Sequence, residues 1–202
     1  MLKKILPLFS YILHPLFISV YAVLIFFYFG DNYSEYFQIY SIIIQIVIVT
    51  IFVPITFYYL LLSLKKVDSI MLEDTSQRKI PLLIHGVLLI ILIRKSIPVN
   101  DFAELHFFFL GSLVSTTLAL IMVYFNYKVS LHMIGVTALT VFTMGISWHF
   151  QVRMINIIMV LLLCSGLVGS SRLVMKAHSG KELILGSLIG SIPQAGLFFL
   201  WL

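Results

Sequence analysis

Charged residues are scarce in this sequence. Asp, Glu, Lys and Arg make up only 10% of its 202 residues, whereas a soluble globular domain contains about 25%. Apolar residues of the AVILMFWYC class make up 61% of the chain, and the mean hydropathy is +1.10. Eight acidic and thirteen basic side chains cannot cover a water-facing surface of ordinary size. The composition therefore excludes a soluble globular protein and predicts an integral membrane protein.

Cysteine is almost absent as well. The single cysteine, Cys164, lies inside an apolar run, which excludes a disulfide framework and a thiolate metal site. The short alternating segments of outer-membrane strands are also missing. Long apolar runs predict helices instead, because in lipid each backbone N–H and C=O group must be satisfied within its own segment. The net charge of +5 resides in short loops, where anionic headgroups and topology account for it, so we expect no nucleic-acid partner.

About 20 apolar residues cross a bilayer as a helix. On this basis the sequence predicts one domain over residues 1–202, an all-α polytopic transmembrane bundle with six or seven spans. The amino-terminal stretch opens like a signal peptide, but it stays apolar to Phe29 without a small-residue cleavage site, so we expect a retained first span. The segment at 81–98 is the weakest because it is short and ends in Arg94 and Lys95. The candidate segments are 6–29, 38–63, 81–98, 105–125, 132–149, 154–171 and 183–202.

The loops differ in positive charge if all seven segments span. Ten cations fall on one side, namely Lys3, Lys4, Lys65, Lys66, Arg78, Lys79, Lys128, Arg172, Lys176 and Lys181. Only Arg94, Lys95 and Arg153 fall on the other. The positive-inside rule then places the first side in the cytoplasm of a multi-pass protein, which we expect in the cell (inner) membrane.

Three polar clusters lie at helix ends on this more positive side. In the first, Arg78 and Lys79 precede a segment that begins at Pro81. Proline suits the first turn of a helix because its missing N–H group costs no hydrogen bond there. Two adjacent cations beside a helix start form a candidate anion site, and the alternative is a solvated loop whose charges set the topology.

The second cluster contains Lys128, Ser130 and His132, directly before an apolar helix. Ser130 is a natural N-cap, and the N-terminus of the following helix attracts phosphate. His132 in the first turn can donate or accept a proton. The alternative is a capping serine beside a histidine that merely sits at the membrane interface.

In the third cluster, Arg172 ends one apolar segment, and His178 and Glu182 open the next. Ser179 and Glu182 have the spacing of a capping box. In the functional interpretation, the Glu182 carboxylate accepts the proton of one His178 ring nitrogen, which fixes the tautomer and makes the other nitrogen a better nucleophile.

Two histidines, a carboxylate and several cations are the groups required for phosphoryl transfer through a phosphohistidine. Cations neutralise the charge on the transferred oxygens, one imidazole attacks phosphorus, and a second protonates the leaving oxygen. The histidines lack carboxylate or cysteine partners at metal-ligand spacing, so we expect neither a metal nor another cofactor.

These residues resemble the signatures of the type 2 phosphatidic acid phosphatase (PAP2) superfamily. The third signature, SR-x5-H-x3-D-x3-G-x3-G, is matched at Ser171, Arg172, His178, Gly186 and Gly190, with Glu182 where Asp is usual. The second signature, PSGH, is similar to the stretch 129–132, which keeps Ser130 and His132. The first signature, K-x6-RP, is poorly kept. Arg78 is the best candidate for its Arg, Met71 stands where Lys is usual, and Pro81 comes two residues late.

The resemblance implies a PAP2-like bundle that hydrolyses a phosphate monoester or diphosphate on a lipid headgroup through a phosphohistidine. His178 would be the nucleophile, oriented by Glu182, and His132 would be the general acid. The expected phosphate ligands are Arg172, Arg78, Lys79, Ser130 and Lys128. A site at helix ends near the headgroups suits a membrane lipid such as phosphatidic acid, phosphatidylglycerol phosphate, undecaprenyl diphosphate or a lipid A phosphate.

Two alternatives remain open at this point, a catalytically lapsed PAP2-like protein and a small transporter with a relict anion site. A transporter places its polar groups near mid-bilayer on broken helices, so clusters at helix ends favour an enzyme. The resemblance implies a site on the periplasmic or outer face, whereas the cation count favours the cytoplasm. The remaining histidines are expected to be structural or interfacial, namely His14, His85, His106 and His149.

Overall fold

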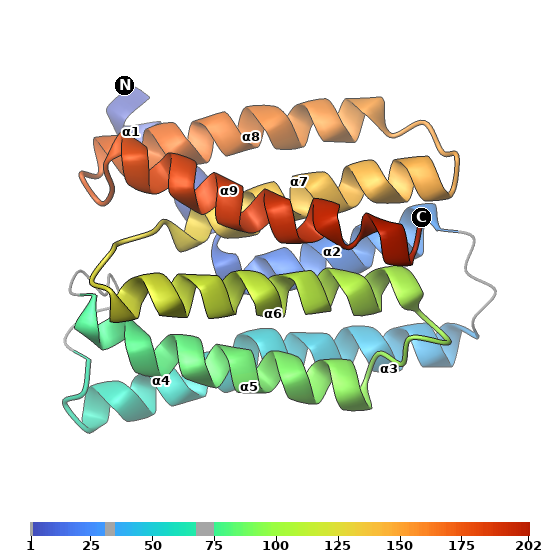
Figure 1. Cartoon of the computed structure of the whole chain (residues 1–202), viewed down its shortest axis with the longest axis horizontal. Coiled ribbons are helices and arrows are strands. Elements are labelled where there is room, and N and C mark those ends of the chain that lie inside the picture. The colour runs from blue at the N-terminus through green and yellow to red at the C-terminus, as the bar shows by residue number, and fades with distance from the viewer. Residues whose placement is uncertain (1, 31–34, 68–74) are drawn as a thin grey trace.

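The computed structural model describes residues 2–30, 35–67 and 75–202, and within these ranges all regular secondary structure is helical (Figure 1). The all-α prediction is therefore confirmed. A π-helical turn at Ile48–Phe52 joins α3 to α4, and a 3₁₀ turn at Ser76–Arg78 leads into α5. The helices are α1 Leu2–Ile12, α2 Pro15–Phe29, α3 Tyr36–Val47, α4 Val53–Ser63, α5 Lys79–Lys95, α6 Ala103–Tyr124, α7 Leu131–His149, α8 Ile155–Val174 and α9 Gly180–Gly196.

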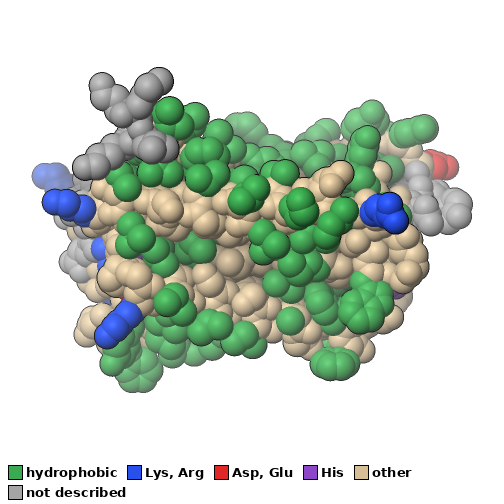
Figure 2. Space-filling model, turned by 90° about the horizontal axis from the view of Figure 1, so that it is seen from above, with side chains coloured by type: hydrophobic (Ala, Val, Ile, Leu, Met, Phe, Trp, Pro, Cys, Tyr) green, Lys and Arg blue, Asp and Glu red, His purple; other side chains and the backbone are tan. Residues whose placement is uncertain are grey.

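Six helical segments are long and apolar enough to cross a membrane, namely Tyr36–Ser63, Ser76–Lys95, Ala103–Tyr124, Leu131–His149, Ile155–Val174 and Gly180–Leu200. The weakest expected span, 81–98, is among them as part of Ser76–Lys95. Large apolar side chains such as Phe37, Leu163 and Phe199 are mostly exposed, as expected for contact with lipid. On the face in Figure 2, Lys and Arg side chains lie toward the two ends of the bundle, with apolar surface between them.

The first expected segment, 6–29, is not one straight span. It breaks into α1 and α2, which are bent by 64° relative to each other. The cause is local: Pro15 disfavours helical backbone at the residue before it, and His14 is extended, with φ −66° and ψ 141°. The His14 ring caps α2, because Nδ1 accepts a hydrogen bond from the Leu16 N–H group at 3.3 Å. A seventh crossing therefore requires the bent pair to act as one span.

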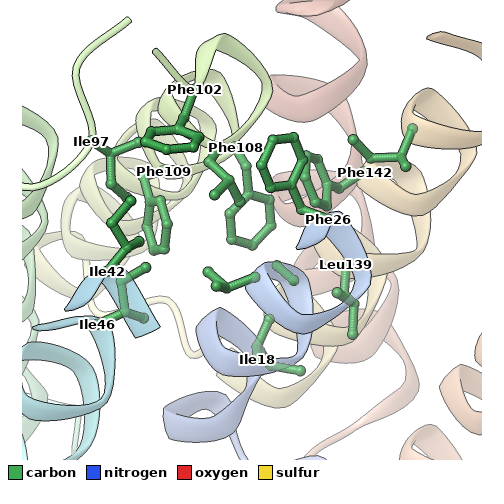
Figure 3. Packing of buried hydrophobic residues seen from close by; sticks show 14 of the residues in the cluster. Ile18, Phe26, Ile42, Ile46, Ile97, Phe102, Phe108, Phe109, Leu139 and Phe142 are labelled. Atoms are coloured by element: carbon green, nitrogen blue, oxygen red, sulfur yellow. The ribbon is translucent and has the colours of Figure 1, made fainter. Parts of the chain in front are cut away.

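The largest core lies among α2, α3, α5, α6, α7 and α8 and is rich in aromatic rings (Figure 3). Phe108 and Phe142 are fully buried, with ring centroids 4.7 Å apart. Phe26 packs edge-on against Phe102 at 6.3 Å. Close van der Waals packing is a main source of helix association in lipid, so this core holds the helices that carry the polar clusters at their ends.

Two glycines bring α9 into backbone contact with α7. A Cβ atom on Gly186 would lie 2.7 Å from the Ser130 carbonyl oxygen, and one on Gly190 would meet the carbonyl oxygen of Ile134. The Thr137 hydroxyl donates to the Ser187 carbonyl across the same interface at 3.2 Å. These contacts place the start of α7 beside the start of α9.

The three polar clusters lie at one end of the bundle. Figure 1 shows the starts of α5, α7 and α9 at the left, together with the end of α8 and with α1. Two helices separate each cluster from the next along the chain, α5 and α6 in the first interval and α7 and α8 in the second. Each even number of crossings returns the chain to the same end of the bundle, which agrees with the expected placement of the three clusters on one side.

Gly190→Ala is expected to destabilise the protein by about 1–3 kcal/mol, because the added methyl group would meet backbone that cannot move aside without separating α7 from α9. The apparent melting temperature in detergent, read by size-exclusion chromatography after heating, should fall. Gly166→Ala on α8 is the matched control, since its Cβ meets nothing within 4 Å. Equal melting temperatures for the two variants would contradict the proposed interface.

Candidate active site

Buried polar side chains concentrate where α5, α7, α8 and α9 meet. The exposed fractions are 6% for Arg78, 8% for Arg172 and 9% for His178, and Ser130 is completely buried. Buried charged groups are rare unless they are paired or functional. These residues come from separate elements, so their convergence is a property of the tertiary structure.

His178 and Glu182 are joined by a short hydrogen bond, with His178 Nδ1 2.6 Å from Glu182 Oε2. A carboxylate only accepts, so the Nδ1–H group donates, and Nε2 keeps its lone pair. Ser179 caps α9 by accepting from the Glu182 N–H group at 3.5 Å. The backbone of Glu182 thus takes part in the cap, while its side chain turns to His178. Glutamate in place of the usual aspartate still reaches the imidazole.

Burial lowers the pKa of His178 to about 4. The hydrogen bond to Glu182 raises this pKa, while the positive charges of Arg78 and Arg172 lower it. Loss of hydration dominates because an imidazolium is costly to desolvate. His178 is therefore a neutral imidazole at physiological pH, which is the form that acts as a nucleophile.

The two buried arginines differ in their bonding. Arg78 Nη1 donates to the Val129 carbonyl at 3.2 Å. Arg172 Nη1 has only a weak contact with Met175 Sδ at 3.9 Å, and its Nε has no hydrogen-bond partner among the described residues. A buried, unsatisfied guanidinium N–H group is unusual in a folded protein. Because guanidinium N–H groups bind oxyanions strongly, Arg172 marks a candidate anion site.

The start of α7 brings a second histidine to the cluster. The Ser130 hydroxyl accepts from the Met133 N–H group at 3.4 Å, which confirms the predicted N-cap. The Ser130 N–H group donates to the Glu182 carbonyl at 3.4 Å. His132 Nε2 donates to the Ser10 carbonyl at 3.1 Å, and His132 lies within electrostatic range of Arg172 and His178.

Two expected phosphate ligands are not brought into this cluster. Lys79 Nζ lies 4.9 Å from the centre of the Tyr124 ring, a cation–π contact that directs the side chain to α6. Lys128 is half-buried and has no hydrogen-bond or ion-pair partner within the described part of the chain. The position of the missing first-signature lysine, Met71, lies outside the described residues.

Sequence reasoning missed two contributors from the bend between α1 and α2. The Ser10 and Ser171 hydroxyl oxygens are 2.6 Å apart and buried. The His14 ring stands edge-on to His132, with centroids 5.1 Å apart and an interplanar angle of 87°. His14 has the structural role expected of it as the cap of α2, but its contact with His132 was not anticipated. The His-Pro dipeptide signals a bend without indicating what the bend approaches.

Two other histidines have contacts typical of structural roles. His106 Nδ1 donates to the Ile97 carbonyl at 2.8 Å, and His149 Nε2 lies 3.1 Å from Glu104 Oε1. Both lie at the opposite end of the bundle from His178. Within the described ranges, no group of three or more His, Cys, Asp or Glu side chains could hold a metal ion.

The cluster thus combines a neutral histidine bonded to a carboxylate, a second histidine and a buried guanidinium with an unused donor. Such a set can bind an oxyanion and transfer a proton to or from it. Comparisons with protein-family models, curated proteins and solved structures find no match to this chain. The PAP2 resemblance stays a prediction that rests on the signature residues.

Orthovanadate should raise the melting temperature of the detergent-solubilised protein, because an oxyanion would satisfy the buried Arg172 donor. At about 100 times its dissociation constant, a bound ligand stabilises by about 2.7 kcal/mol. Arg172→Gln should abolish the shift. Arg153→Gln, which removes a cation at the opposite end, should retain it. An equal shift in both variants would exclude Arg172 from the anion site.

His178 should remain neutral between pH 8 and pH 5 in NMR spectra of histidine-labelled protein. The pKa of His178 is near 6.5 in the unfolded chain and about 4 in the folded protein. Between these pH values the unfolded state therefore binds a proton that the folded state does not bind. The contribution of His178 to stability is therefore complete above pH 6.5 and is lost as the pH falls toward 4. A titration midpoint near 6.5 for His178 would contradict its desolvation.

Proposed function

We propose that this protein is an inner-membrane lipid phosphatase of the PAP2 type, which hydrolyses a phosphate monoester or diphosphate on a lipid headgroup through a phosphohistidine. The observation that carries the proposal is the 2.6 Å bond between His178 Nδ1 and Glu182 Oε2 beside a buried guanidinium. Glu182 fixes the tautomer in which Nε2 is the nucleophile. Arg172 and Arg78 supply the charge that attracts the phosphate.

In this proposal the phosphate dianion binds against Arg172 and Arg78. The unused Nε donor of Arg172 supports this assignment, because an oxyanion is the ligand that would satisfy it. Ser130 and the first turn of α7 add the positive end of a helix to the same region. Lys79 and Lys128 act at most through their charge, since neither has a described contact with this cluster.

The reaction proceeds in two displacements. His178 Nε2 donates its lone pair to phosphorus and the P–O bond to the lipid breaks. His132, which is neutral in the free protein and takes up a proton when the anionic phosphate binds beside it, gives that proton to the leaving oxygen. Water then attacks the phosphohistidine, and His132 takes a proton from that water. The P–N bond breaks, its electron pair returns to Nε2, and inorganic phosphate leaves. Neither displacement requires a metal or another cofactor.

A lipid substrate fits the position of the cluster. His178 and Glu182 lie at the start of a membrane-spanning helix, where headgroups meet the apolar band. A lipid there presents its phosphate to the histidine while its acyl or prenyl chains stay beside the exposed apolar side chains. A soluble phosphate ester would gain nothing from this location.

Detergent-solubilised protein with EDTA should release phosphate from at least one member of a panel of phosphatidic acid, phosphatidylglycerol phosphate, undecaprenyl diphosphate and lipid A. His178→Ala should reduce turnover at least about 10³-fold, because it removes the nucleophile, and His132→Ala about 10²–10⁴-fold. His149→Gln, at the opposite end, is the control and should keep wild-type turnover.

Turnover that survives His178→Ala would refute the phosphohistidine mechanism. An inactive wild type that still binds vanadate through Arg172 would favour the non-catalytic alternative, a membrane protein with an anion site. The first result requires an active wild type and the second an inactive one, so assay of the wild type alone distinguishes them.

A further inference from the structure

The bent amino-terminal segment, formed by α1 and α2, contacts the candidate site although it belongs to none of the three polar clusters. The 64° bend turns α1 away from the direction of α2 and packs it against α8. Ser10 near the end of α1 is 3% exposed, and its hydroxyl lies 2.6 Å from that of Ser171. Ser171 directly precedes Arg172, so this bond attaches α1 beside the buried guanidinium.

The backbone of Ser10 makes a second connection, to His132. The last four carbonyl groups of a helix have no intrahelical partner, and Ser10 is within the final turn of α1. Its carbonyl oxygen accepts from His132 Nε2 at 3.1 Å. A carbonyl only accepts, so Nε2 carries the proton and the lone pair of the neutral ring lies on Nδ1.

His14 contacts the same ring from another direction. Its Nδ1 accepts from the Leu16 N–H group, which leaves its proton on Nε2 and holds the ring against the start of α2. The edge-on contact at 5.1 Å then restricts rotation of the His132 ring about its own side-chain bonds. His132 is thus held by a hydrogen bond on one nitrogen and by a neighbouring ring.

We propose that Ser10 and His14 are positioning residues for His132, which they orient so that Nδ1, rather than Nε2, exchanges the proton with the leaving group and the attacking water. This inference rests on the proposed phosphatase function. It assigns a role to the amino-terminal bend, and it names the reacting nitrogen of the general acid.

Loss of a residue that positions the general acid should slow some substrates more than others, whereas loss of the fold should slow all substrates alike. An alkyl phosphate needs a proton on its leaving oxygen, whereas nitrophenolate leaves without one. Because kcat/KM covers the steps up to the first irreversible one, it reports the transfer of phosphorus to His178. Misorientation of His132 should therefore slow dioctanoyl phosphatidic acid far more than p-nitrophenyl phosphate.

The variants separate the contacts. Ser10→Ala removes the hydroxyl bond to Ser171 but keeps the backbone carbonyl. His14→Asn keeps an N-cap acceptor for α2 but removes the ring beside His132. Ser165→Ala on α8 is the matched serine control, because among the described residues the Ser165 hydroxyl bonds within its own helix, to the Leu161 carbonyl.

We expect Ser10→Ala and His14→Asn to lower kcat/KM for dioctanoyl phosphatidic acid about tenfold or more, a fraction of the full general-acid effect, with a change below about threefold for p-nitrophenyl phosphate. His132→Ala should show the same selectivity in larger degree, and Ser165→Ala should match wild type. Combining Ser10→Ala with Ser171→Ala should cost no more than either alone, since both remove one bond.

Equal losses on both substrates, or no loss, would overturn the positioning role while leaving the phosphatase intact. A wild type that hydrolyses neither substrate would instead refute the proposed function. The ¹⁵N shifts of labelled His132 test the geometry without turnover. They should report the Nε2–H tautomer in wild type and a mixture of tautomers in His14→Asn, and a wild-type Nδ1–H tautomer would overturn the inference.

Discussion

The desolvated positive charge of Arg172 is the constraint around which the polar end of the bundle is organised. Arg172 is only 8% exposed, and its Nε has no hydrogen-bond partner in the described ranges. A buried charge is expensive unless something compensates it. It acts electrostatically on four neighbours, His14, Arg78, His132 and His178. A bound oxyanion would compensate this charge, and in the proposed function the neighbouring histidines would react with it.

Such a site requires a rigid scaffold, because the repulsion between buried cations would otherwise separate the helices. The aromatic core around Phe108 and Phe142 supplies rigidity along the bundle. Near the site, Gly186 and Gly190 let α9 lie directly against α7. The contact between α7 and α9 keeps His132 and His178 at the same end of the bundle, because each histidine lies within a few residues of the start of its helix.

The bend at His14 shows how a local backbone rule contributes to a distant site. Pro15 disfavours helical backbone at His14, which is extended, so α1 leaves the path of α2 and packs on α8 instead. The unsatisfied carbonyl at its end then becomes a partner for His132. A helix break leaves backbone groups without hydrogen bonds, which is costly in lipid. Here the His132 ring bonds the Ser10 carbonyl, and the His14 ring bonds the Leu16 N–H group.

Local patterns in the sequence were sufficient for the membrane class, the helices and two local features of the site. The His178–Glu182 pair and the Ser130 cap span four and three residues, and both lie where a chain enters a helix, so the local geometry of a helix start brings their atoms together. Longer-range features were not predictable. Ser10 meets Ser171 across 161 residues, and Lys79 turns to Tyr124 instead of the cluster. The sequence lists which groups stand at helix ends, but only packing and the 64° bend decide which of them face one another. The reason is that hydrophobic periodicity is fixed residue by residue, whereas the direction of a side chain depends on every helix packed around it.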